Sequence, residues 1–146
     1  MGYVNGSDLL VMVGSKAAGH CTTHTATFST ETKDTAVKPA ASVAAGSTSL
    51  FKNKRVSGLS VQVKADGLVF SGETESGFKD ILAAWKAGTP VALKLFKRGG
   101  DATPYCSGNF IISSLENTAP AGEDATYSAT FDNDGAVAID ETKYAV

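Results

Sequence analysis

The sequence is poor in cysteine, and Cys21 and Cys106 are its only thiols. Two cysteines are too few for a disulfide scaffold, and the amino terminus lacks the basic segment followed by an apolar one that marks an export signal. We therefore expect a protein kept in the cytoplasm with reduced thiols. A bridge between Cys21 and Cys106 is the less favoured alternative, because that compartment is reducing.

Long apolar runs and an excess of basic residues are also missing. No run approaches the roughly 20 residues that span a bilayer, so we expect no membrane anchoring. Lys and Arg number 13 against 15 Asp and Glu, which gives a net charge of −2. Proteins that grip nucleic acid cluster basic residues, so any contact with DNA should be weak or repulsive. The length suits one domain over residues 1–146 with a single core.

Several stretches have side chains that alternate with period two or form short apolar runs, patterns that favour β-strands. They are residues 8–13, 20–30, 55–64, 91–96, 105–116 and 125–131. Within residues 20–30, Thr23, Thr25, Thr27 and Ser29 should form a hydroxyl-rich face. Asp66-Gly67 predicts a tight turn before a returning strand. The tail from Asn133 onward is expected to form an edge strand or an arm.

Residues 76–87 form the only convincing helix, because four apolar side chains recur at helical spacing. These are Phe78, Ile81, Leu82 and Trp85. Thr74 or Ser76 should cap the first turn, and Gly88 should end the helix. We place Trp85 in the core rather than in a carbohydrate pocket, because it belongs to the apolar stripe.

One helix cannot cover both faces of the predicted sheet. The fold class is therefore mainly β: an antiparallel β-sandwich or partly closed barrel with one flanking α-helix. Residues 31–55 are rich in small polar residues and predict a long loop. Loops longer than about 12–15 residues in a compact domain are usually functional or disordered, and binding a partner would explain this one.

Two groups of residues invite a chemical interpretation that strand geometry disfavours. His20, Cys21, His24 and Cys106 are zinc-ligand types. On a strand, however, Cys21 and His24 point to opposite faces, while His20 and His24 lie about 13 Å apart at roughly 3.3 Å per residue. A Cys/His nucleophile pair also lacks an orienting third group.

Acidic and glycine-rich segments have structural explanations. Glu73, Glu75 and Asp80 suit the start of a helix through its dipole. Residues 99–101 lack the GxxxxGK[ST] phosphate-loop pattern and should form a turn. We therefore predict no enzyme, metal or cofactor. The basic cluster at residues 51–55 could bind nucleic acid, but a solvated loop end or a salt-bridging interface is the simpler interpretation.

A series of segments resembles one known family. Asn5–Lys16 is followed by His24–Thr35, which contains a Glu-Thr-Lys-Asp-Thr run. The later segments are Gly77–Leu82, Gly88–Val91, Gly108–Leu115, Pro120, Ala125–Phe131 and Gly135. Their order over nearly the whole chain resembles the major tail proteins, or tail tube proteins, of long-tailed bacteriophages.

The resemblance implies a self-assembling structural protein of the virion tail. Its copies would form hexameric rings that stack into a tube, and genomic DNA would pass through without specific binding. Assembly in the host cytoplasm, terminal arms, and tape measure, initiator and terminator proteins as partners are implied too. We therefore expect the loop to contact a neighbouring subunit or ring, through Lys33, Asp34, Lys38, Phe51, Lys52, Lys54 and Arg55.

Two other function classes stay open. A monomeric β-sandwich binding module could use the same loop to recognise a carbohydrate or a surface. An enzyme is more distant, because no nucleophile, metal cluster or cofactor loop stands out.

Overall fold

The computed structural model describes residues 2–14, 16–17, 21–35, 53–70, 77–98 and 103–144. Its strands are β1 (Leu9–Val13), β2 (Lys16–Ala17), β3 (Cys21–Asp34), β4 (Lys54–Leu68), β5 (Val91–Lys97), β6 (Cys106–Thr118), β7 (Thr126–Asn133) and β8 (Ala138–Ile139). Helix α1 spans Phe78–Ala87, and the 3-10 turns η1 and η2 span Gly6–Asp8 and Glu141–Lys143.

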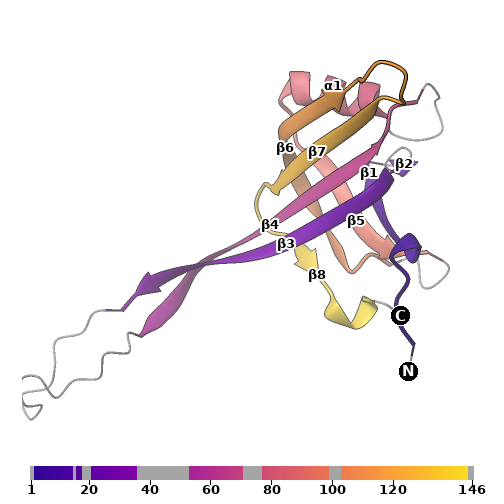
Figure 1. The fold of residues 1–146 in the computed structure, drawn as a ribbon. Helices are drawn as coiled ribbons and strands as arrows, with labels where there is room; N and C mark the ends of the chain where they lie inside the picture. Colours follow the sequence, from indigo (N-terminus) through magenta and orange to yellow (C-terminus); the bar gives the residue numbers. More distant parts are fainter. Residues whose placement is uncertain are drawn as a thin grey trace, which may run out of the picture. The chain divides into compact units, whose positions relative to one another are not determined.

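The strands form one eight-stranded sheet in the order β2-β1-β5-β6-β7-β4-β3, and β8 pairs with β6. The sheet curls into a half-barrel, and α1 lies beside β6 (Figure 1). The predicted class, a mainly β and partly closed barrel with one flanking helix, is thus confirmed over the described residues. In that part of the chain no helix is long and apolar enough to cross a membrane.

The chain divides into two compact units. The body comprises residues 1–27 and 61–146, and the second unit comprises residues 28–60. Strands β3 and β4 each contribute residues to both units.

The core of the body comes from alternate residues of its strands. Val63 pairs with Phe131 across β4 and β7, and Phe131 pairs with Ile112 of β6. All three side chains are buried. Burying each such side chain stabilises the fold by about 1.5–3 kcal/mol. The predicted period-two strands therefore supply the core.

The predicted turn at Asp66-Gly67 is wrong, because β4 continues through both residues to Leu68. The ladder to β7 extends as far, with Gly67 opposite Tyr127 and Leu68 opposite Thr126. Pairing along a neighbouring strand outweighs the local turn preference of this dipeptide. After β7, β8 pairs with β6, which confirms the expected edge strand in the tail.

Helix α1 confirms the predicted helix, and Gly88 ends it at a φ of 69°, in the left-handed region. Its N-cap is Gly77 without a side-chain cap bond, so the prediction of Thr74 or Ser76 is wrong. Those two residues lie outside the described part of the chain.

The predicted core position of Trp85 is wrong too. Its side chain is 52% exposed, and Leu82 is also exposed, whereas Ile81 is buried. The apolar stripe of α1 is wider than the face that packs on the body, where Phe78 and Ala84 complete the contact. Helical spacing predicted the stripe but not how much of it the sheet covers.

Candidate assembly interface

The residues predicted to form an assembly loop lie mostly at strand ends. Lys33 and Asp34 end β3, and Lys54 and Arg55 begin β4. The loop predicted over residues 31–55 is therefore wrong at both ends. Backbone pairing reaches further, because the Thr35 N–H donates to the Asn53 carbonyl at 2.9 Å. A composition of small polar residues does not predict such pairing. Lys38, Phe51 and Lys52 lie outside the described residues.

The second unit exposes large apolar side chains. Phe28, Val56 and Leu59 are all exposed, the last of them by 75%. No residue described in this unit is buried. A two-stranded ribbon without a core is marginally stable in water. These exposed apolar side chains would therefore gain most by packing against a partner.

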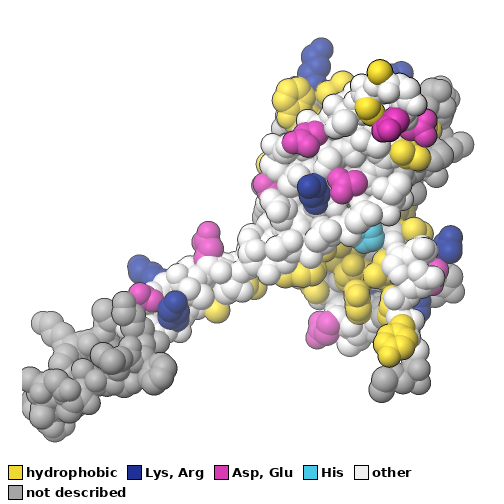
Figure 2. Space-filling model, in the orientation of Figure 1, with side chains coloured by type: hydrophobic (Ala, Val, Ile, Leu, Met, Phe, Trp, Pro, Cys, Tyr) yellow, Lys and Arg dark blue, Asp and Glu magenta, His cyan; other side chains and the backbone are white. Residues whose placement is uncertain are grey.

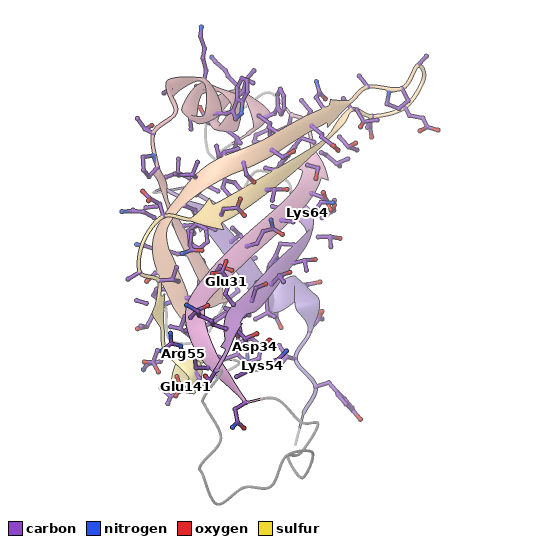
Figure 3. The ribbon with its side chains drawn as sticks, turned by 90° about the vertical axis from the view of Figure 1, so that its left-hand side faces the viewer. Glu31, Asp34, Lys54, Arg55, Lys64 and Glu141 are labelled. Atoms are coloured by element: carbon purple, nitrogen blue, oxygen red, sulfur yellow. The ribbon has the colours of Figure 1, made fainter. Side chains whose placement is uncertain are left out.

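The charges of the second unit are mixed. Glu31 and Asp34 lie on β3, and Lys54 and Arg55 lie on β4 (Figure 3). Lys33 adds a third cation, and all five residues are exposed. The described residues of this unit thus carry three cations against two carboxylates, a nearly neutral mixture. Such a mixture suits salt-bridging contacts with protein better than a grip on phosphates.

The body presents a second candidate surface, which we name the polar face. It consists of the outward residues of β4, β7 and β6, identified by their register. Its members are Gln62, Lys64, Asp66, Leu68, Ile111, Ser114, Glu116, Thr118, Thr126, Ser128, Thr130 and Asp132. On β3 the side chains of Thr23, Thr25 and Thr27 are exposed, in agreement with the hydroxyl-rich face that the sequence predicts for this strand.

The polar face carries little charge, and that charge is mildly acidic. Lys64 is its one cation, against the carboxylates of Asp66, Glu116 and Asp132. Figure 2 shows charged side chains scattered over this side of the body. The Gln62 Nε2 donates to the Asp132 Oδ1 at 3.0 Å. A surface rich in hydroxyls and poor in cations would repel a polyanion or bind it only weakly.

The Cys106 thiol is buried, whereas Cys21 and His24 are partly buried. Cys21 and Cys106 are free, and the Cys21 Sγ donates to the Thr23 carbonyl at 3.4 Å. Burial raises the pKa of both thiols, so little thiolate is present at neutral pH. Burial likewise lowers the pKa of His24.

No group of three metal-ligand types occurs among the residues that the structure describes. His20, Glu73, Glu75 and residues 99–101 lie outside them. Asp80 lies in the first turn of α1, as predicted.

Comparison with known proteins gives a family and a fold. Residues 3–139 match the family model for phage tail tube proteins. No curated protein matches the chain.

Several solved structures share the fold, and three of them illustrate the likeness to this chain. The tail of an empty gene transfer agent particle with C6 symmetry is 17% identical with a TM-score of 0.71, covering 94% of this chain and 99% of that one. The SPP1 tail tube is 12% identical with a TM-score of 0.68, covering 94% and 80%. A sheath–tube complex of an extracellular contractile injection system is 15% identical with a TM-score of 0.55, covering 94% and 93%.

Proposed function

Because the chain belongs to the phage tail tube protein family, we propose that its copies close into hexameric rings, which stack into a tube that conducts DNA. The family gives the chain a structural role in the tail tube. The C6 symmetry of the similar gene transfer agent tail supports rings of six. One tail-tube domain over residues 1–146 would provide both ring and stacking contacts.

The exposed apolar side chains of the second unit carry the proposal. Phe28, Val56 and Leu59 are exposed in a unit that has no described buried residue. In a tube, a neighbouring subunit or ring covers them. The mixed charges at Lys33, Asp34, Lys54 and Arg55 then align that contact. Lys38, Phe51 and Lys52 are proposed to join it.

The polar face is proposed to line the conduit. Double-stranded DNA carries one negative charge per roughly 1.7 Å of its axis, so a wall with many cations would retain it. Lys64 is the one cation on this face, and three carboxylates balance it. DNA would thus pass without specific binding. Replacing Thr130 and Ser128 with Lys should slow DNA delivery by assembled particles, whereas Ala121→Lys in an exposed turn should not.

A tube of this kind implies further protein partners at its interior and at its ends. Tape measure, initiator and terminator proteins would contact its interior and ends, and no membrane anchoring or cofactor is needed. The protein would be non-enzymatic, assemble in the host cytoplasm and reside in the virion tail. The matched cap and terminator of related injection systems support end-binding partners.

Negative-stain microscopy of concentrated protein tests the proposal. Rings or tubes with sixfold symmetry are expected, with or without a tail initiator. A protein that stays monomeric throughout and binds a carbohydrate would instead be a binding module.

A further inference from the structure

We propose that the outer face of α1 binds the β8–η2 segment of a second copy, in a head-to-tail contact. The inference rests on the proposed function. Two surface patches of the body carry it. The helix patch comprises Lys79, Leu82, Trp85 and Lys86, and the tail patch comprises Ile139, Asp140, Glu141 and Tyr144.

The helix patch is apolar with a cationic border. Leu82 and Trp85 are exposed although they belong to the apolar stripe of α1. Lys79 lies three residues before Leu82 and Lys86 four residues after it, so helix geometry places all three on one side. Figure 2 shows hydrophobic side chains and a basic one at the α1 end of the body. Asp80 lies on the opposite side of the helix.

The tail patch is apolar with an anionic border. Ile139 and Tyr144 are each about half exposed. The patch is firmly placed, because Ile139 pairs with Cys106 and the Tyr144 ring meets the Tyr105 ring edge-on at 4.9 Å. Asp140 caps η2 by accepting the Thr142 N–H, so its carboxylate has a fixed position.

Opposite net charge and the separation of the two patches commit this pairing to a second copy. The helix patch offers two cations around an indole. The tail segment offers two carboxylates and one cation, Lys143, around a phenol and an isoleucine, so its charge is net negative. Figures 1 and 3 place α1 and η2 at opposite ends of the body, so one molecule cannot make the contact with itself. Two different patches that meet form a heterologous contact, the type that builds rings and filaments.

Charge reversal tests the contact. Lys79→Glu with Lys86→Glu should raise the protein concentration needed for assembly by roughly tenfold, because like charges then face each other. Glu141→Lys alone should also raise it. Combining all three changes should recover most of the assembly. Lys94→Glu on β5 is the matched control and should assemble normally. Circular dichroism and thermal melting check that each variant folds.

Cross-linking then locates the partner surface. With Trp85 replaced by the photoreactive benzoylphenylalanine, assembled protein should cross-link to residues 138–144 of another copy, as mixed isotope labelling would show. Tubes that form but cross-link elsewhere, or a triple variant without recovery, would overturn this contact and leave the tube intact. Wild-type protein that forms no tubes would instead overturn the proposed function.

Discussion

The Asn133 Oδ1 accepts the backbone N–H of Val61 at 2.9 Å, which continues the β4–β7 ladder by one side-chain bond beyond Gln62. The Asn133 Nδ2 in turn donates to the Gly135 carbonyl at 2.9 Å. Val61 is buried, so its N–H has little access to water. One side chain thus fixes both the end of this ladder and the turn that leads to β8.

Asn133→Ala should destabilise the protein by about 1–3 kcal/mol, because it leaves the partly buried Val61 N–H without this acceptor. Urea unfolding measures the change. Asn133→Asp keeps the acceptor and should cost clearly less. Equal losses in the two variants would show that the bond to Val61 contributes little.

Gly88→Ala should destabilise α1, because a residue with a side chain is strained at a φ of 69°. An added methyl group would meet no atom within 4 Å, so no new packing would compensate for that strain. The expected cost is about 1–2 kcal/mol. Gly6→Ala is the matched control, since Gly6 has open space and no positive φ. Thermal melts that are equal for both variants would contradict the helix end described above.

Tyr105 should titrate late. Burial, followed by the nearby Tyr144 and Cys106, raises its pKa to about 12 from an ordinary 10.0. Because the pKa of Tyr105 is higher in the folded than in the unfolded protein, the neutral phenol contributes to the free energy of unfolding. This contribution is fully present below pH 10 and is lost as the pH rises towards 12. Absorbance at 295 nm should show a late component that Tyr105→Phe removes. A late component that survives in Tyr105→Phe would assign it to another tyrosine.

The exposed Leu59 of the second unit should matter for assembly and not for folding. Leu59→Ser should change the free energy of unfolding by less than about 0.5 kcal/mol, because the side chain is 75% exposed. Tubes should form poorly, since the polar residue no longer packs against a neighbour. Ser60→Ala, also exposed, is the control. Normal tubes from Leu59→Ser would remove the second unit from the interface.

The sequence predicts the strands and the helix of this protein better than it predicts which of their side chains other elements cover. Alternation located the core strands, and glycine chemistry located the end of α1 at Gly88. Trp85 was misplaced because helical spacing defines a stripe without saying how much of it a sheet will cover. The turn predicted at Gly67 is wrong because the conformation of this residue depends on its pairing with Tyr127, which lies far along the chain.

The candidate site was predictable only in part. A basic and acidic mixture marked Lys54 and Asp34 as surface residues, but their positions on paired strands depend on long-range hydrogen bonds. The exposure of Leu59 had no sequence signal, because the pattern of β4 is the same inside and outside the body. An apolar residue of an alternating strand is ordinarily assigned to a core.

A helical reconstruction of assembled tubes by electron cryomicroscopy tests the central claim most directly. The account predicts six copies per ring, with Lys64 and Thr130 facing the lumen and Leu59 covered by a neighbouring copy. Protein that remains monomeric at every concentration and with a tail initiator, or a tube with the polar face outside, would contradict it.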